Sequence, residues 1–287
     1  MVIIMADNQS IDEMKQIRKK IFLTAYAGGT AHLASAFSLV EIMHVLYEKG
    51  ILRYDAKNPL WPNRDRFILS KGHGGLALFV MLQRAGFISE ELLKSFIKPG
   101  SLLGGEPKYG DIPGVEATTG SLGHGLSLGI GMAMAHKMDG NDSKTYVVVG
   151  DGELEEGTVW EGIMSAARYH LNNLTVILDC NGIQKMGPVE NTMEISEWRT
   201  RLEAFHWEVD EIEDANEVSQ VFACLKKENN TDKPRFIIAH TVKGKGVSIM
   251  ENNHNWHFKM PNKRELKVFM EELGISQEEL DECKKHI

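Results

Sequence analysis

The chain has 287 residues, of which 43% are hydrophobic and 25% are charged, and these proportions are ordinary for a globular enzyme. Its formal net charge of −8 disfavours a nucleic acid or an anionic membrane surface as the main partner. The sequence shows neither an apolar run of the roughly 18 residues that suggest a membrane span nor a signal-peptide pattern, and its three cysteines are far apart, so we expect free thiols and a cytoplasmic protein.

The first part of the chain predicts helices and one short strand. Helical periodicity runs through residues 8–26 and again through 38–50, where Ser38 is a candidate N-cap. The apolar run 66–69 predicts a strand that leads through a glycine-rich turn into an apolar helix at 76–84.

A long glycine- and proline-rich segment follows at residues 98–125. Irregular segments of this length inside a compact domain tend to be functional. The helix that begins near Ser121 has small residues on all sides, which indicates close packing against a sheet.

The second part of the chain alternates strands and helices. Strands at 146–149 and 174–178 flank a helix at about 154–169, in which Trp160, Ile163, Met164 and Ala167 form an apolar face, and a last strand covers 235–241. This alternation predicts an α/β fold with a doubly wound parallel sheet and helices on both faces. We expect one domain over residues 1–287, with a peripheral, charged helical segment at 263–287.

Two polar groups follow neighbouring strands of this sheet. Asp151, between two glycines, ends the first strand, and Asn181 lies thirty positions later, just beyond the second. Ligands collect beyond the carboxyl ends of parallel strands, and Mg²⁺ and Ca²⁺ prefer such oxygen ligands while keeping positions for phosphate oxygens. The backbone N–H groups of Gly152 and Glu153 are placed to meet those oxygens. The pattern predicts a metal–diphosphate site, in which the ion offsets the charges of the acidic residues at 153–156.

Several basic side chains are weaker candidates. Four histidines have small neighbours, namely His32, His73, His124 and His257. His73 is favoured because it lies in a turn between a strand and a helix, where anions bind. Three lysines are candidates for anion contact, although exposed lysines are usually solvated: Lys71, Lys243 and Lys245.

These residues resemble a known family. Gly150-Asp-Gly152 with Asn181 looks like the fingerprint of thiamine-diphosphate (ThDP) enzymes, and three further segments are similar to transketolase. These segments are Asp65-Arg-Phe-Ile-Leu-Ser-Lys-Gly-His-Gly74, Pro113-Gly-Val-Glu-Ala-Thr-Thr-Gly-Ser-Leu-Gly-His-Gly125 and His240-Thr-Val-Lys-Gly-Lys-Gly246. The likeness runs from about residue 11 to residue 262, so it implies a ThDP-binding fold for nearly the whole chain.

The resemblance implies roles for individual residues. The side chains of Asp151 and Asn181 and the carbonyl of Ile183 would ligate the metal, which we expect to be Mg²⁺, with Ca²⁺ or Mn²⁺ as alternatives. The other residues implied to contact the cofactor are His73, Gly120, Leu122, Gly150, Gly152, Glu153 and His257, with Gly120 and Leu122 at the aminopyrimidine. His32, His73 and His257 would act at the reacting centre, where His32 and His73 would hydrogen-bond the sugar donor. Glu156 would join a proton network across a dimer interface.

The resemblance also implies a missing half. Transketolases continue into a pyrimidine-binding domain, which supplies the glutamate that activates the cofactor. We therefore expect the N-terminal subunit of a split transketolase, active with a separate C-terminal subunit, self-associated across a two-fold axis and acting on sugars or sugar phosphates. The charged C-terminal segment favours this interpretation over a fragment of a longer chain.

Three departures from the family pattern lie around the expected donor. Glu106 replaces a histidine in a Gly-His-Pro motif, Lys185 and Met186 follow Ile183 in place of an apolar residue and aspartate, and Phe258 replaces a glycine. They leave the identity of the donor open.

We therefore predict a ThDP- and metal-dependent transferase that moves a two-carbon ketol unit. One alternative is the α subunit of a 2-oxoacid dehydrogenase or an enzyme similar to deoxyxylulose-phosphate synthase, and another is a non-catalytic or regulatory ThDP-binding module.

Overall fold

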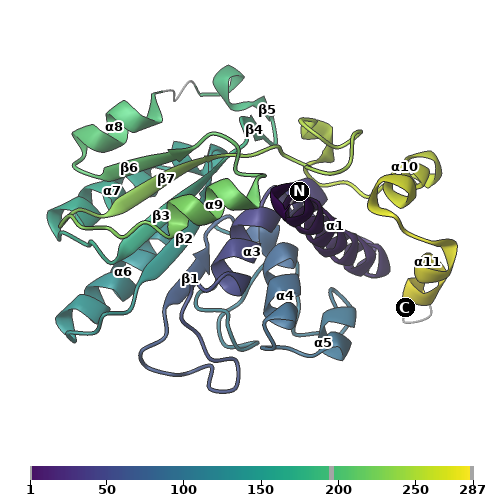
Figure 1. Ribbon diagram of the computed structural model, residues 1–287, viewed down its shortest axis with the longest axis horizontal. Coiled ribbons are helices and arrows are strands. Elements are labelled where there is room, and N and C mark those ends of the chain that lie inside the picture. Colours follow the sequence, from purple (N-terminus) through teal and green to yellow (C-terminus); the bar gives the residue numbers. More distant parts are fainter. Residues whose placement is uncertain (1, 194–196, 285–287) are drawn as a thin grey trace.

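Five parallel strands form the centre of the computed structural model, which describes residues 2–193 and 197–284 (Figure 1). In spatial order they are β1 (Arg66–Leu69), β2 (Thr145–Gly150), β3 (Leu174–Cys180), β7 (Arg235–His240) and β6 (Glu208–Ile212). Leu69 pairs with Val148, Gly150 with Asp179, and Cys180 with His240. Because every strand runs in the same direction, four strand ends meet at one edge of the sheet.

Helices cover both faces of this sheet. One face carries α1 (Val2–Gly28), α2 (Leu33–Phe37), α3 (Val40–Glu48), α4 (Gly75–Arg84), α5 (Glu90–Lys94), α9 (Val218–Leu225), α10 (Lys263–Leu273) and α11 (Gln277–Lys284). The other carries α6 (His124–Met138), α7 (Gly157–Arg168) and α8 (Trp198–Ala204). Single 3-10 turns lie at Gly72–Gly74, Gly152–Glu155, Val189–Asn191 and His254–Trp256, and a small hairpin joins β4 (Ile183–Gln184) to β5 (Gly187–Pro188). The predicted doubly wound α/β fold is confirmed.

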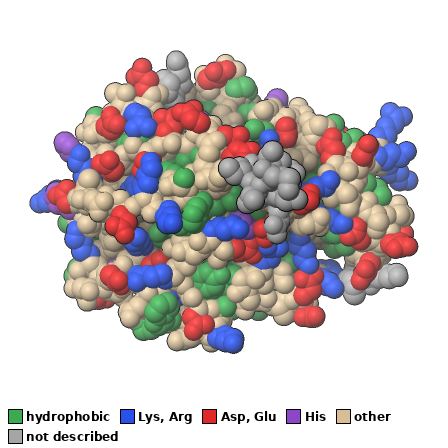
Figure 2. Space-filling view, viewed as in Figure 1, with side chains coloured by type: hydrophobic (Ala, Val, Ile, Leu, Met, Phe, Trp, Pro, Cys, Tyr) green, Lys and Arg blue, Asp and Glu red, His purple; other side chains and the backbone are tan. Residues whose placement is uncertain are grey.

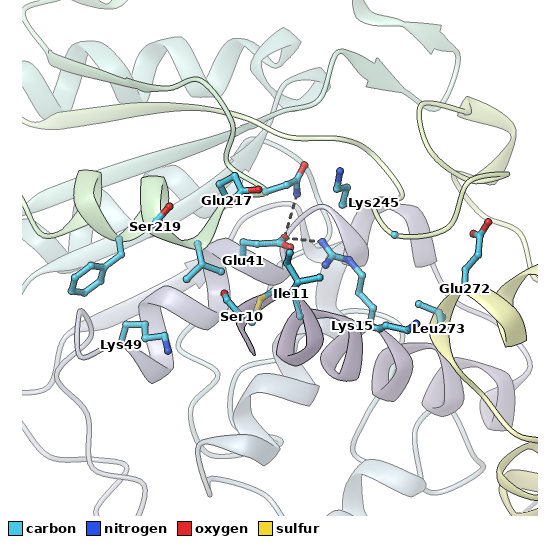
Figure 3. Close-up of a pocket in the computed structure, with 16 residues that line it drawn as sticks. Ser10, Ile11, Lys15, Glu41, Lys49, Glu217, Ser219, Lys245, Glu272 and Leu273 are labelled. Atoms are coloured by element: carbon cyan, nitrogen blue, oxygen red, sulfur yellow. Dashed lines mark hydrogen bonds and ion pairs between the residues drawn. The ribbon is translucent and has the colours of Figure 1, made fainter. Parts of the chain in front are cut away.

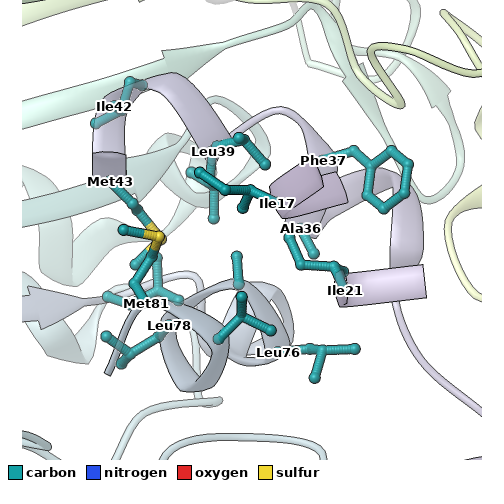
Figure 4. Packing of buried hydrophobic residues seen from close by; sticks show 14 of the residues in the cluster. Ile17, Ile21, Ala36, Phe37, Leu39, Ile42, Met43, Leu76, Leu78 and Met81 are labelled. Carbon is teal, nitrogen blue, oxygen red and sulfur yellow. The ribbon is translucent and has the colours of Figure 1, made fainter. Parts of the chain in front are cut away.

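The core consists of two apolar layers separated by the sheet. Successive strand residues alternate between the layers: Val148 and Ile177 face α1–α4, whereas Val147 and Val176 face α6 and α7. Figure 4 shows part of the first layer, in which side chains from α1, α2, α3 and α4 pack together. The layers hold the strands, and therefore the strand ends, in fixed positions.

The C-terminal helices form one edge of the molecule (Figure 1). Asn262 caps α10 in a capping box with Glu265, and Gly274 ends the helix with φ 66°. Phe269 and Leu273 of α10 and Leu280 of α11 are buried in the layer that contains α1. The segment therefore lies at the periphery, while its apolar residues extend the core. That residues 1–287 form a single domain stays a prediction.

Several local predictions need correction. Ser38 does not cap α3, which begins at Val40 without a side-chain cap; its hydroxyl bonds the Asp179 carboxylate at 2.7 Å instead. The acidic residues 153–155 lie in a 3-10 turn that precedes α7, not in the helix itself. Met164 is 50% exposed and leaves the apolar face of α7, because it is rotated by about 100° around the helix from the buried Ile163.

Surface charge and helix length add little to the functional argument. On the face shown in Figure 2, acidic and basic side chains are interspersed. Within residues 2–193 and 197–284, no helix combines the length and apolar character needed to span a membrane. The cytoplasmic location stays a prediction.

Candidate active site

The ends of β1, β2, β3 and β7 meet at one edge of the sheet and carry most of the predicted site residues. Lys71 follows β1, Asp151 follows β2, Asn181 follows β3 and Lys243 follows β7. Residues from four distant parts of the sequence therefore come together because parallel strands end at a common edge.

The Asp151 carboxylate lies against the turn that contains Asn181. Its Oδ2 accepts a hydrogen bond from Gly182 N at 2.5 Å, and its Oδ1 accepts one from Gly152 N at 2.8 Å. Asn181 Oδ1 accepts from Ile183 N at 3.2 Å in the same turn. A carboxylate beside a turn that offers amide and carbonyl oxygens is typical of the ligand set of a hard divalent cation, so the predicted metal ligands fit such an ion.

Burial changes the acidity of Asp151. Desolvation first, and the negative charge of Asp179 second, raise its pKa to about 6. A divalent cation would favour the ionised form, because only that form coordinates metal.

Lys71 and Asp179 form a buried ion pair that was not predicted from the sequence and that supports the site. The Asp179 carboxylate is fully buried near the end of β3 and accepts hydrogen bonds from Lys71 Nζ, Thr241 Oγ1 and Ser38 Oγ. Burial alone would raise the pKa of Asp179, but the Lys71 charge and these donors lower it. Lys71 is only 2% exposed, so its side chain is not the solvated charge typical of lysine. An aspartate that continues an otherwise apolar strand run is the signal that could have found this pair.

Lys243 lies between His257 and the turn at residues 181–183, whose oxygens are predicted metal ligands and which is called the metal-type turn below. Its Nζ donates to the Ile183 carbonyl at 2.6 Å and lies 3.4 Å from His257 Nδ1. Desolvation, followed by the Lys71 charge, lowers the pKa of Lys243 to about 8. The buried ammonium therefore stands beside an oxygen predicted to ligate metal, in a place where negative groups of a ligand are favoured.

Three of the four highlighted histidines form a cluster. The ring centroid of His32 lies 5.4 Å from that of His73 and 5.3 Å from that of His257, and the last two are 5.3 Å apart. Local sequence alone did not mark His32 or His257 as functional, because their proximity depends on the loops after α1 and β7.

Nearby lysines and burial keep these imidazoles uncharged. Desolvation, then the Lys243 charge, lowers the pKa of His257 to about 3 and also lowers the pKa of His32. Desolvation, then Lys71, brings the pKa of His73 well below its ordinary value. At neutral pH each ring has one N–H donor and one acceptor nitrogen.

A cavity of about 280 Å³ opens beside the histidines. Its lining includes His32, His73, Glu106 and Phe258, and the Phe258 ring centroid lies 4.6 Å from that of His32. Two departures from the family pattern therefore border the same space as two of the predicted catalytic histidines.

Comparison with known proteins identifies the family. The family profile for the thiamine diphosphate binding domain of transketolase matches residues 11–286. One subunit of an apulose-4-phosphate transketolase from Phocaeicola vulgatus is 39% identical, covering 92% of this chain and 93% of its own. A 6-deoxy-6-sulfo-D-fructose transketolase subunit from a Clostridium species is 36% identical over 79% of this chain and 83% of its own. The chain belongs to the transketolase family.

Solved transketolases share the fold but are longer. The structure of the Campylobacter jejuni enzyme superposes with a TM-score of 0.83 at 30% identity, covering 95% of this chain and 46% of that one. The present chain thus spans about half the length of that transketolase, whereas it matches nearly all of the Phocaeicola vulgatus relative. The predicted type of protein, an N-terminal transketolase subunit, is confirmed, and relatives named as subunits imply a separate partner chain.

Membership of the transketolase family also confirms the predicted cofactors, ThDP with a divalent metal ion. The oxygen ligands of Asp151, Asn181 and Ile183 fit the ion, and Lys243 fits an adjacent anion. A Cβ on Gly152 would lie 3.0 Å from Gln184 Cβ, so glycine at this position lets the turn after β2 pack closely against β4.

The remaining predicted residues lie around this centre in different ways. Gly120 has φ +137°, and a Cβ there would lie 2.0 Å from Glu106 Oε2, so the Glu106 carboxylate rests on the glycine expected at the aminopyrimidine. Leu122 is partly exposed in the same loop. Glu153 is buried, and its side chain accepts hydrogen bonds from Ser70 Oγ, Gly123 N and Gly150 N. Its carboxylate therefore holds three backbone segments together, and only its backbone groups are free to contact a ligand.

Two of the highlighted basic residues lie apart from the histidine cluster, and Glu156 lies at the surface. His124 is exposed at the start of α6, and Lys245 lines a different cavity. Glu156 is exposed at the N-cap position of α7, where a second chain has access to it.

Proposed function

We propose that the chain is the cofactor-binding subunit of a split transketolase. In the overall reaction the C2–C3 bond of a ketose or ketose phosphate breaks, and the two-carbon ketol unit passes to the carbonyl carbon of an aldehyde. ThDP, when bound, supplies the carbon nucleophile for the ketose carbonyl. The residues of this chain bind the cofactor, orient the donor and hold protons.

The strand edge would hold the charged end of the cofactor. Asp151, Asn181 and the Ile183 carbonyl would ligate Mg²⁺, and Lys243 would offset the remaining negative charge of the diphosphate. The other cofactor contacts in this proposal are Gly150, Gly152, the backbone of Glu153, His73 and His257, with Gly120 and Leu122 at the aminopyrimidine.

The neutral histidines would act on the donor. His32 and His73 line the cavity and can donate or accept hydrogen bonds from sugar hydroxyls. With His257 they would stabilise negative charge that develops on the former carbonyl oxygen, and preorganised donors of this kind often give the largest catalytic contribution. Glu106 and Phe258 border the same cavity and would influence which donor fits.

A single observation carries the proposal. The Lys243 ammonium contacts both the Ile183 carbonyl and His257, so the metal-type turn and the histidine cluster form one continuous site. A turn that only bound metal would need no cavity with neutral imidazoles beside it.

The second chain would complete the site. The proposed partner is a pyrimidine-binding subunit that supplies the activating carboxylate, and two copies of each subunit would assemble with Glu156 near the two-fold interface. Relatives of nearly the same length that are named as transketolase subunits favour this assembly. They disfavour the non-catalytic module and the 2-oxoacid dehydrogenase alternative.

Reconstitution tests this proposal. The chain is mixed with a candidate pyrimidine-binding chain encoded beside it in the genome, and transfer from a panel of ketoses to an aldehyde is measured with ThDP and Mg²⁺. We expect turnover by the mixture and none by either chain alone. His73→Ala should abolish turnover while the chains still co-elute, whereas exposed His124→Ala should keep it. Co-eluting chains that bind ThDP but turn over no ketose would support the non-catalytic module.

A further inference from the structure

A second cavity, of about 660 Å³, lies apart from the histidine cluster (Figure 3). It is bounded by α1, the end of α3, the start of α9, the loop at residues 245–246 and the end of α10. Apolar side chains form much of its lining, namely Ile11, Met14, Val218, Phe222 and Leu273. This volume lies within the roughly 300–1,000 Å³ typical of small-molecule sites.

The charges around this cavity are not balanced. Lys15, Lys49 and Lys245 line it, and no described residue forms an ion pair with any of them. Glu41 forms an ion pair with Arg18, whereas Glu272 accepts a hydrogen bond from Ser248 and keeps its charge, so four basic side chains face three acidic ones among the described lining residues. Glu217, exposed at the rim, is the one lining carboxylate without a described partner. The cavity therefore has an excess of positive charge although the chain as a whole carries −8.

A buried arginine offers an unused donor. Arg18 is 4% exposed, and its Nη2 donates to the Phe37 carbonyl at 3.1 Å and to Glu41 at 2.7 Å. Its Nε has no hydrogen-bond partner among the described residues. The Arg18 guanidinium therefore retains hydrogen-bonding capacity that protein groups do not use.

The positive groups gather at one end of the cavity. Lys15 precedes Arg18 by one turn of α1, so both side chains lie on the same side of the helix. A Cβ on Gly246 would lie 2.9 Å from Arg18 Cδ, which places the loop that carries Lys245 directly against Arg18. Figure 3 shows Lys49 at the opposite side, beyond Ile11.

We propose that this cavity binds a small organic anion with an apolar or aromatic body. Its phosphate, sulfonate or carboxylate group would meet Lys15 and Lys245 next to the positive charge of Arg18, where hydrogen bonds between charged groups are strong. Its body would pack on Ile11, Met14 and Phe222. The site is separate from the proposed cofactor site, because Lys243 points to Ile183 whereas Lys245 lines this cavity.

Dye binding tests the site on the full chain with saturating ThDP and Mg²⁺. The probes are 8-anilinonaphthalene-1-sulfonate and N-phenyl-1-naphthylamine, which share an aromatic body but differ in the sulfonate. In the double variant Lys15→Gln/Lys245→Gln we expect the dissociation constant of the anionic dye to rise at least about tenfold, the loss of roughly one charged hydrogen bond. Binding of the neutral dye should not change.

Two further variants locate the effect. Lys57→Gln/Lys144→Gln removes the same charge at exposed lysines elsewhere and should leave both dyes unaffected. Val218→Trp fills the cavity without a change in charge and should weaken both dyes. Equal affinity of the anionic dye for the parent and the Lys15/Lys245 variant would contradict the proposal, as would undiminished binding of both dyes to Val218→Trp.

Discussion

At the scale of single residues, we predict that Asp151 sets the pH dependence of metal binding. Its carboxylate is buried beside the negative charge of Asp179, and its pKa of about 6 lies above the ordinary value. The protonated form cannot coordinate a cation, so metal affinity should fall as the pH drops through this pKa. Lys243, with a pKa of about 8, stays mostly protonated over the same range and adds little to the change.

Calorimetry with Ca²⁺ alone tests this dependence, because the ion itself does not titrate. Between pH 7 and pH 5 the ionised fraction of Asp151 falls from about nine-tenths to about one-tenth, so the affinity should fall about tenfold. Asp151→Asn should bind weakly at both values. An affinity that is the same at pH 7 and pH 5 in the parent would show that Asp151 is not a ligand.

Glu106 is the second residue with a specific prediction. Its carboxylate lies against Gly120 and borders the cavity of His32 and His73. Glu106→Gln keeps the shape and removes the charge, so a charged hydrogen bond to a donor hydroxyl becomes a neutral one. We expect kcat/KM for the ketose to fall about tenfold, or about 1.4 kcal/mol, with unchanged ThDP affinity.

The control for this variant is Glu213→Gln, an exposed glutamate on another part of the surface. It should leave both quantities as in the parent. If Glu106→Gln weakened ThDP binding and spared kcat/KM for the donor, Glu106 would belong to the cofactor site instead.

The sequence predicted Asp151 and Asn181 because they follow strand runs that are strongly apolar, and the resemblance to transketolase added Ile183. It did not predict the pairing of Lys71 with Asp179 or the burial of Lys243, since these depend on which strands are neighbours in the sheet. The same holds for Ser38, whose hydroxyl was expected at a helix end and in fact bonds a strand 141 positions away.

At the scale of elements, the small residues of α6 have unequal roles. A Cβ on Gly129 would lie 2.4 Å from Val147 Cγ2 in β2, whereas a Cβ on Gly131 would meet nothing within 4 Å. Close packing on the sheet therefore requires glycine at one position and not at the other.

This difference gives a matched pair of variants in one helix. Gly129→Ala should lower the free energy of unfolding by about 1–3 kcal/mol through overpacking. Gly131→Ala should leave it unchanged or raise it by about 0.5–1 kcal/mol through better helix propensity. Urea unfolding measures both, and equal effects would contradict this account of how α6 packs.

The Lys71–Asp179 pair is the main polar connection between β1 and β3. Asp179→Leu or Lys71→Met alone leaves a buried charge without its partner, which typically costs about 3–5 kcal/mol. The double variant should be less destabilised than the sum of the two single variants, as urea unfolding of all four proteins would show. Additive losses would mean that the two side chains do not interact.

Strands with strong apolar patterns were predicted from the sequence, and strands with polar or very short patterns were not. β2, β3 and β7 are nearly continuous apolar runs, as expected for buried parallel strands. The edge strand β6 reads Glu-Val-Asp-Glu-Ile with mixed burial, so its sequence resembles a surface loop. The hairpin of β4 and β5 has two residues in each strand, too few for a periodic signal.

At the scale of the whole molecule, we propose that a second chain completes the site. Glu106 and Phe258 are exposed beside the histidine cavity, and Met186 is 77% exposed in the turn between β4 and β5. Phe258 and Met186 are apolar, so contact with a second chain would remove their exposed surface from water. The lengths of the relatives named as subunits agree with a cofactor site divided between two proteins.

Metal-dependent binding of ThDP tests the central claim most directly. Calorimetry compares the parent chain with Asp151→Ala and with the control Asp139→Ala, an exposed aspartate at the end of α6, each with and without Mg²⁺. We predict that the parent and the control bind ThDP only with Mg²⁺ and that Asp151→Ala does not bind measurably. If Asp151→Ala bound ThDP in Mg²⁺ as tightly as the parent, the edge formed by β2 and β3 would not be the cofactor site.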